Sequence, residues 1–123
     1  MTELTDSQIN YLASQRLGRI ATSGKDHKPH VVPTSFRYNA ELRTIDVGGM
    51  HVATTKKYRD VQATQVAAIV VDDLASIDPW RPRMLEIRGR AEALAQGGAE
   101  LGPGFGDGFI RIYPEKVNSF GID

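Results

Sequence analysis

Three cations lie within four residues of the chain, at Lys56, Lys57 and Arg59. They stand at the start of residues 53–63, which the sequence predicts to form a short helix before the apolar run at residues 66–71. Amide groups at a helix start have no partner within the helix, so a phosphate bound there gains backbone donors as well as charged side chains. We therefore predict an anion site at this basic turn. The alternative is a basic turn that only faces water, as most lysines do.

A second group of cations follows the apolar run, next to Trp80, the only tryptophan in the chain. Its four arginines surround one acid, Glu86, and are Arg81, Arg83, Arg88 and Arg90. If this segment lies near the basic turn of the same chain or of a second copy, the two together would hold a long polyanionic ligand, with Trp80 facing a flat ring. The alternative is that Arg88 and Arg90 lie on the wet face of a strand and that Trp80 fills a dimer interface.

Other chemistries find little support in the sequence. His27 and His30 have an HxxH spacing, but it falls across a turn and no carboxylate or thiolate stands in zinc spacing beside it. No serine occupies a G-x-S-x-G motif, and the glycine-rich residues 102–108 lack the GK[ST] of a phosphate loop. We predict no metal site and assign no catalytic residue; Ser35, Tyr38 and Tyr58 are candidates for a proton donor only.

Length and composition limit the class of protein. The 123 residues predict a single domain, 1–123, and the 15 basic and 15 acidic residues give no overall field for a nucleic-acid or membrane partner. The absence of cysteine excludes disulfides and a cysteine nucleophile, and it fits a reducing cytoplasm. No leader precedes Leu4, and the longest apolar run is too short to span a bilayer. We expect a cytoplasmic protein whose limited core a dimer would extend.

The N-terminal half predicts one helix and a meander of strands. Thr5 and Gln8 have the spacing of a capping box, so a helix starts near Asp6, and Gly18 is placed to end it. Strands are predicted at residues 19–23, 30–39 and 43–49. Pro33 cannot donate to a ladder and so marks an edge, a bulge or a contact with another molecule. The glycines at 48 and 49 permit close approach of a ligand to the backbone.

The C-terminal half predicts further strands with mostly short connections. They lie at residues 66–73, 84–94, 109–114 and 117–122. The unbroken apolar run of the first of these strands predicts cover on both faces. Two prolines stiffen residues 74–83 into a loop, and residues 95–107 form a flexible glycine-rich connector. A mainly β fold with short helices, a closed or split barrel, fits this order better than a doubly wound sheet.

Several stretches of the chain resemble a known superfamily. RIAT, KPHVVPTSF, TTKKYRD before VAAIVVDD, and RIYPEKVNSFGI resemble the split-barrel flavin and deazaflavin enzymes related to pyridoxamine 5'-phosphate oxidase. Within it, IDPWRPRMLEIRGRAE is similar to a subgroup that depends on the deazaflavin coenzyme F420 and includes reductases of tetracycline-type polyketide biosynthesis. The resemblance covers nearly the whole chain. It implies a homodimeric six-stranded split β-barrel with two cofactor sites between the subunits.

The resemblance also implies roles for individual residues. Lys57 matches the phosphate-binding lysine of the family, with Lys56 and Arg59 as helpers. Pro33, Thr34 and Ser35 match the family's strand along the coenzyme ring. Val47, Gly48 and Gly49 match the strand end beside the coenzyme. Trp80, Arg81 and Arg83 match a loop that reaches the site of the other subunit. In one departure, the connector before the last strands is shorter than in many relatives and has glycines where they have helix.

The implied activity is hydride transfer from reduced F420 to an electron-poor C=C or C=N of a planar small molecule. The protein would bind and align the reactants, since side chains cannot donate a hydride. Two alternatives stay open: an FMN oxidase or flavin reductase of the same fold, and a carrier that stores flavin or deazaflavin. Because the long acidic tail of F420 needs more cations than the single phosphate of FMN, the two basic segments favour F420.

Overall fold

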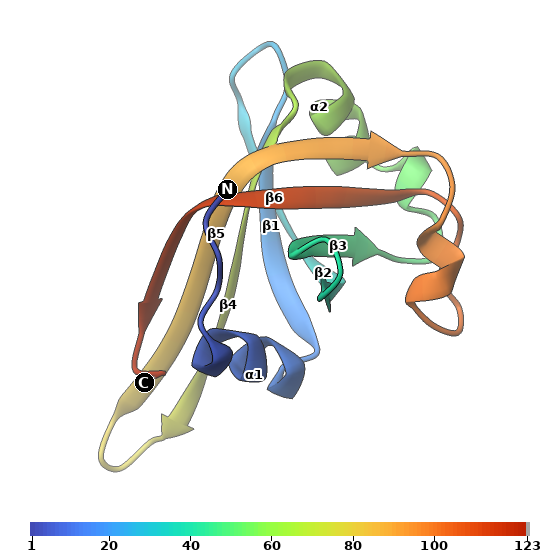
Figure 1. Cartoon of the computed structure of the whole chain (residues 1–123). Helices are drawn as coiled ribbons and strands as arrows, with labels where there is room; N and C mark the ends of the chain where they lie inside the picture. Colours follow the sequence, from blue (N-terminus) through green and yellow to red (C-terminus); the bar gives the residue numbers. More distant parts are fainter. Residues whose placement is uncertain (123) are drawn as a thin grey trace.

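The chain forms a six-stranded antiparallel barrel in a computed structural model that describes residues 1–122 (Figure 1). The strands follow the order β1-β2-β3-β6-β5-β4, and β4 closes the barrel by pairing with β1. The elements are α1 (Asp6–Ser14), β1 (Leu17–Ser23), β2 (Pro29–Asn39), β3 (Thr44–Gly48), η1 (Val52–Thr54), α2 (Lys56–Thr64), β4 (Val66–Ser76), β5 (Arg81–Leu94), η2 (Gly98–Leu101) and β6 (Phe109–Phe120). The predicted mainly β split barrel with short helices is confirmed.

Alternation along the strands places one face of each in the core. Ile20, Ile45, Ile87 and Ile112 come from four different strands and are all fully buried. Burying a side chain of this size stabilises a fold by about 1.5–3 kcal/mol. The core therefore lies inside the barrel. The prediction that both faces of β4 are covered is wrong within this chain, because Val66, the first residue of β4, is 51% exposed on the outer face.

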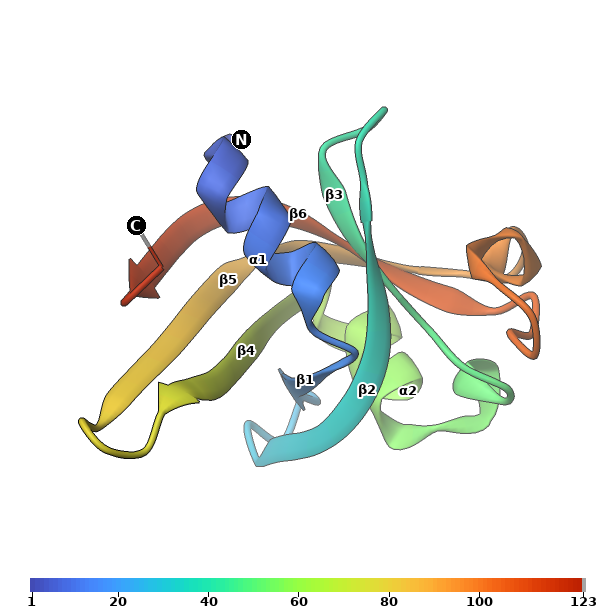
Figure 2. The same ribbon diagram turned by 90° about the horizontal axis from the view of Figure 1, so that it is seen from below.

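Helix α1 begins as predicted and lies across one opening of the barrel (Figure 2). Gln8 N donates to Thr5 Oγ1 at 3.2 Å and Thr5 N donates to Gln8 Oε1 at 2.9 Å, which completes the capping box. The helix ends at Ser14, and the prediction that Gly18 caps it is wrong. Gly18 lies within β1, where a Cβ would approach the side chains of Ile69 and Val71 to 3.1 Å, so close packing explains this glycine.

A polar network ties α1 to the β4–β5 hairpin. The Tyr11 hydroxyl donates to Asp73 Oδ1 at 2.9 Å, and the Arg83 guanidinium donates to both oxygens of the same carboxylate. The hydrogen bonds from Arg83 hold the pKa of Asp73 below its ordinary value, and burial raises the pKa of Tyr11. Asp73 is therefore held ionised in the folded chain.

This network predicts how stability depends on pH. Because the folded-state pKa of Asp73 is lowered, its contribution is present above the unfolded-state pKa of about 4 and is lost as the pH falls through the folded-state value. We expect the free energy of unfolding of the wild type to fall below pH 4, and to fall less steeply in Asp73→Asn. Urea denaturation between pH 3 and 7 measures this. Asp78→Asn, at an exposed aspartate in the same hairpin, is the control and keeps the wild-type slope; equal slopes in all three proteins would contradict the assignment.

Two C-terminal predictions are wrong for identifiable reasons. The predicted loop at residues 74–83 is mostly hairpin, since β4 runs to Ser76 and β5 starts at Arg81. Pro82 is tolerated there because it pairs with Leu74 on one side and lies beyond the end of β6 on the other. The predicted turn at residues 114–117 is a bulge inside a continuous β6. Opposite it stands Gly89, where a Cβ would lie 1.9 Å from Tyr113 O.

Candidate functional site

The basic turn forms the start of α2, as predicted. Thr55 is the N-cap residue, and its Oγ1 accepts a hydrogen bond from Tyr58 N at 3.4 Å. Helix α2 packs mainly on β1 and β5, at the barrel end away from the tip of the β4–β5 hairpin (Figure 1). The three cations of the turn therefore lie at one end of the molecule, and the structure assigns them different surroundings.

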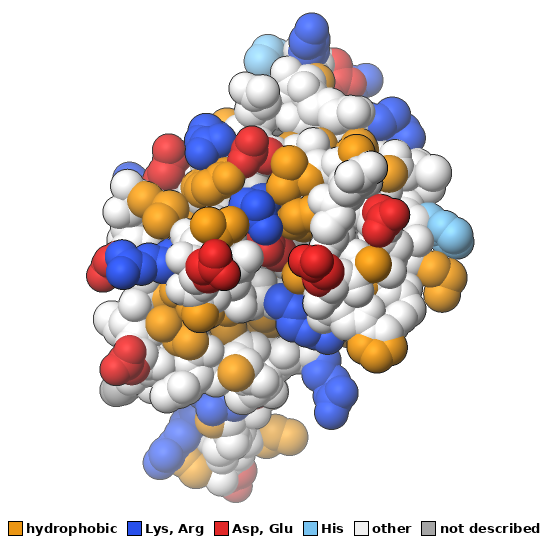
Figure 3. All heavy atoms as spheres, turned by 45° about the vertical axis from the view of Figure 1, so that its right-hand side comes forward, with side chains coloured by type: hydrophobic (Ala, Val, Ile, Leu, Met, Phe, Trp, Pro, Cys, Tyr) orange, Lys and Arg blue, Asp and Glu red, His pale blue; other side chains and the backbone are white. Residues whose placement is uncertain are grey.

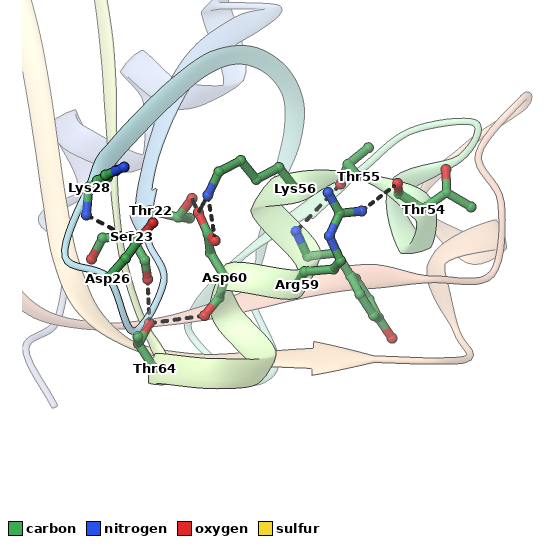
Figure 4. Close-up of polar contacts among 11 residues, drawn as sticks. Thr22, Ser23, Asp26, Lys28, Thr54, Thr55, Lys56, Arg59, Asp60 and Thr64 are labelled. Atoms are coloured by element: carbon green, nitrogen blue, oxygen red, sulfur yellow. Dashed lines mark hydrogen bonds and ion pairs between the residues drawn. The ribbon is translucent and has the colours of Figure 1, made fainter.

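Lys56 is held by a buried carboxylate. Its Nζ donates to Asp60 Oδ1 at 2.8 Å and Oδ2 at 3.0 Å, and Thr22 Oγ1 of β1 donates to the same carboxylate at 2.9 Å (Figure 4). Burial raises the pKa of Asp60, but the hydrogen bonds from Lys56 and Thr22 outweigh it and the pKa lies below its ordinary value. These contacts fasten α2 to β1.

Arg59 is exposed and lies over the start of the helix (Figure 4). Its Nη1 donates to the backbone oxygen of Thr54 at 3.1 Å, and no carboxylate of residues 1–122 forms an ion pair with it. The guanidinium is oriented by the protein and retains donors for a ligand.

Lys57 differs from both of its neighbours. The residue is 9% exposed. Its ammonium forms no hydrogen bond or ion pair with any side chain or carbonyl of residues 1–122. Burial lowers the pKa of Lys57, and no neighbouring charge offsets that effect. Every fully enclosed side-chain nitrogen and oxygen in residues 1–122 has a partner, so the ammonium must still reach the surface. A mostly buried cation that lacks an internal anion and faces an opening fits a phosphate or carboxylate ligand.

The structure brings the predicted ring strand and strand end together. β2 pairs with β1 up to Ser35 and with β3 from Ser35 onward, so Ser35 faces Leu17 on one side and Gly48 on the other. Pro33 and Ser35 point outward, and Thr34 is buried. On the β3 side the backbone of β2 is open before Ser35, which places Pro33 at an unpaired edge, one of the positions predicted for it.

The end of β3 is covered by the chain itself. Val47 is fully buried, and a Cβ at Gly48 would lie 2.6 Å from the Phe105 ring. Gly106 N donates to Gly49 O at 2.8 Å. The prediction of a flexible connector at residues 95–107 is therefore wrong, because this loop packs against β3. The glycine at 48 is needed for that packing.

The second basic group is spread along the β4–β5 hairpin. Trp80, 66% exposed, and Arg81 stand at the tip of the β4–β5 hairpin, whereas Arg83 is held by Asp73. The tip lies at the far end of β4 from α2, so one chain does not bring Trp80 and Arg81 to the basic turn (Figure 1). Arg88 and Arg90 lie on the outer face of β5, 3.7 and 3.8 Å from Glu86 and Glu92.

A cleft between α1 and β2 was not predicted. Its volume is about 910 Å³, and it begins at Ser35. Arg16, Arg37, Tyr38 and Phe105 line it together with the apolar face of α1. The sequence gives only a weak signal for this cleft. Arg16 stands just before β1, and Arg37 follows Ser35 by two residues and so lies on the same outward face of β2.

The surface and the described side chains add three observations. Figure 3 shows acidic and basic groups interspersed over the face turned forward, without a large patch of one sign. Within residues 1–122, no three His, Asp or Glu side chains gather as a metal site would require. None of the helices in the same residues has the length and apolar character needed to cross a membrane.

Comparison with known proteins identifies the family. No family model matches the chain. The chain is 40% identical over 119 residues to a 5a,11a-dehydrotetracycline/5a,11a-dehydrooxytetracycline reductase of Streptomyces rimosus. The match covers 97% of this chain and 84% of that protein. The chain belongs to this reductase family. The resemblance predicted from the sequence is confirmed, and the chain is an oxidoreductase of the split-barrel class.

Solved structures show the fold of the family. A FAD-binding protein of Mesorhizobium loti superposes with a TM-score of 0.68 at 23% identity, over 94% of each chain. A Corynebacterium glutamicum protein assigned to the pyridoxamine 5'-phosphate oxidases gives a TM-score of 0.65 at 14% identity, over 96% of this chain and 94% of that one. Both share the barrel of this reductase family.

Proposed function

We propose that the protein is a reductase that uses F420 to reduce an electron-poor C=C or C=N of a planar small molecule. The observation that carries the proposal is Lys57, a mostly buried side chain at the start of α2 whose ammonium has no anion partner within residues 1–122. Such a group fits the phosphate of a flavin-type coenzyme. The reductase of Streptomyces rimosus supports the reaction class.

The residues of the chain bind and align. Lys57 and Arg59 hold the phosphate, and Lys56 keeps the helix in place through Asp60. The backbone of β2 at Pro33, Thr34 and Ser35 lines the ring, whereas residues 47–49, proposed for the same role from the sequence, are covered by the loop that holds Phe105. When bound, the coenzyme would supply a hydride to the electron-poor C=C or C=N, and solvent water would supply the proton. Positioning of this kind lowers barriers by about 7–11 kcal/mol in favourable cases.

A homodimer completes the proposed site. The outer faces of β1, β2 and β4 carry apolar residues that this chain leaves exposed, including Leu17, Val31 and Val66. Trp80 and Ile77 stand 66% and 75% exposed at the hairpin tip. A second copy would cover these surfaces and bring Trp80 and Arg81 to the basic turn of its partner. Sedimentation equilibrium measures the dimer directly, and a monomer at all concentrations would contradict it.

FMN is the competing cofactor. F420 is favoured because its acidic tail needs cations beyond those that hold the phosphate, and Arg81 is exposed without a carboxylate partner in the described residues. The competing role is a carrier that stores the coenzyme without turnover.

Binding and turnover separate these possibilities. Titration of the purified protein with F420, FMN and FAD is followed by fluorescence quenching. Oxidation of reduced F420 is then measured with a dehydrotetracycline, menadione and biliverdin as acceptors. We expect F420 to bind more tightly than FMN and to be oxidised with at least one acceptor. Preference for FMN would reject the cofactor, and binding without oxidation would indicate the carrier.

A further inference from the structure

We propose that Lys57 is a site of acylation by acyl phosphates, and that the acyl group on its nitrogen closes the anion site at the start of α2. Acetyl phosphate is the simplest reagent of this class. The covalent step depends only on residues of the described chain. Its regulatory consequence, loss of coenzyme binding, rests on the proposed function.

Lys57 differs from every other lysine of the chain in its surroundings. The sequence contains five lysines, and the other four are exposed: Lys25, Lys28, Lys56 and Lys116. Lys57 is 9% exposed, and its ammonium has no hydrogen-bond or ion-pair partner within residues 1–122. Because no fully enclosed side-chain nitrogen in those residues lacks a partner, this ammonium is in contact with the surface. A reagent can therefore meet a nitrogen that no carboxylate holds.

The surroundings of Lys57 favour its reactive form. Only the uncharged amine of a lysine attacks a carbonyl carbon, and a lysine in water is almost entirely protonated at neutral pH. Burial lowers the pKa of Lys57, so a larger fraction of this amine is uncharged. The nearest acid in the sequence, Asp60, is engaged by Lys56 and Thr22 and does not offset this effect. Lys56 lacks the same advantage, because its nitrogen is held by that carboxylate.

The start of α2 also holds donors for the phosphate of the reagent. The first two amides of the helix, at Lys56 and Lys57, have no acceptor within residues 1–122. Arg59 lies over the same turn, where its Nη1 donates to Thr54 O at 3.1 Å and its other N–H groups remain available (Figure 4). Side chains of a helix lean toward its N-terminus, so the stem of Lys57 is expected over this turn. The amine and the phosphate donors therefore belong to one site.

The covalent step is an acyl transfer without any change of oxidation state. The amine nitrogen of Lys57 attacks the carbonyl carbon of the acyl phosphate, and a C–N bond forms. The bond between that carbon and the bridging oxygen breaks, and phosphate leaves with the electron pair. The nitrogen releases its proton to water. Binding of the phosphate at the helix start keeps the carbonyl close to the amine, which raises the rate above that at lysines in water.

Acylation would switch the site off. The amide product carries no charge, so the coenzyme phosphate loses the cation that the proposed function assigns to it. The acyl group would also occupy the opening at the helix start. A bound coenzyme would in turn cover the amine and protect it. The reductase would thereby stay active where coenzyme is abundant and lose activity where acyl phosphates accumulate.

The test measures acetylation at each lysine of the full-length protein without coenzyme. The protein is incubated with acetyl phosphate and digested with chymotrypsin, and tandem mass spectrometry gives the rate at every lysine. We expect Lys57 to react about tenfold faster than Lys25, Lys28 and Lys116. Excess inorganic phosphate is expected to slow Lys57 and to leave these three unchanged. A rate at Lys57 equal to or below that of the three exposed lysines would overturn the inference.

Variants and a second reagent test whether the phosphate group is recognised. Arg59→Ala removes an exposed side chain and is expected to slow acetylation of Lys57 about tenfold, because a charged hydrogen bond to phosphate is lost. Arg43→Ala, at an arginine of the β2–β3 turn that pairs with Glu3, is the control and keeps the wild-type rate. The neutral N-hydroxysuccinimide ester of acetic acid has no phosphate and is expected to show less preference for Lys57. Equal preference with both reagents would overturn the inference.

Protection by coenzyme separates the acylation site from the proposed function. With F420 or FMN at about ten times its Kd, we expect acetylation of Lys57 to slow about tenfold with at least one of them. Fast acetylation that neither coenzyme slows would contradict the proposed coenzyme site and the regulatory consequence, while the acylation site itself would stand. Uniform acetylation of all lysines would overturn the acylation site and leave the F420 titration to decide the proposed function.

Discussion

Replacing Lys57 with methionine is expected to weaken coenzyme binding about 10- to 150-fold, because a charged hydrogen bond to phosphate contributes about 1.5–3 kcal/mol. Methionine retains most of the buried stem of the side chain and removes only the ammonium. The packing of α2 on the barrel is therefore preserved. Fluorescence titration with F420 measures the change in Kd.

Stability separates a binding role from a structural one. Burial lowers the pKa of Lys57, so the unfolded chain binds this proton more tightly and the group opposes folding at neutral pH. Lys57→Met is then expected to unfold at the same or a higher urea concentration than wild type. Lys25→Met, in the exposed β1–β2 turn, is the matched control and keeps both Kd and stability. Wild-type affinity in Lys57→Met would remove the central support for the proposed coenzyme site.

The largest effect on stability is expected at Asp46, where alanine should lower the free energy of unfolding by about 3–5 kcal/mol. Asp46 is 1% exposed and accepts from Arg111 Nε and Nη2, each at 3.0 Å. Thr44 and Asn39 donate to the same carboxylate at 2.9 and 3.1 Å. Alanine leaves the partly buried Arg111 cation without its anion. Urea denaturation at neutral pH measures the loss.

Two comparisons identify the cause of that loss. In the double variant Asp46→Leu with Arg111→Met, both charges are removed, and we expect a much smaller loss than in Asp46→Ala. Glu3→Ala breaks the exposed pair with Arg43 and is expected to change stability by less than about 1 kcal/mol. If the double variant were as unstable as Asp46→Ala, lost packing rather than an unpaired charge would explain the result.

Features that depend on a few neighbouring residues could be predicted from the sequence. The Thr5–Gln8 capping box is a local hydrogen-bond pattern, and it formed where the spacing indicated. The alternation of Leu85, Ile87 and Ala91 placed one face of β5 in the core as expected. The barrel followed because such strands can bury their apolar faces only against one another.

Features that depend on distant partners could not be predicted. Pro82 indicated a loop, yet it is tolerated because β6 ends before reaching it. Gly48 indicated a ligand, yet the space above it is filled by Phe105. Arg16 and Arg37 line one cleft only because α1 packs beside β2, and nothing in their local sequence distinguishes them from the six arginines that are paired with carboxylates.

The carboxylate of Asp60 has a consequence for how quickly a coenzyme leaves. It fastens the first turn of α2 to Thr22 of β1 through Lys56, so the position of Lys57 is established when the chain folds. Little mobility remains to be lost on capture of an anion, which is the condition for a preorganised site. Differences in affinity among variants of this helix then reside in residence time rather than in the speed of encounter.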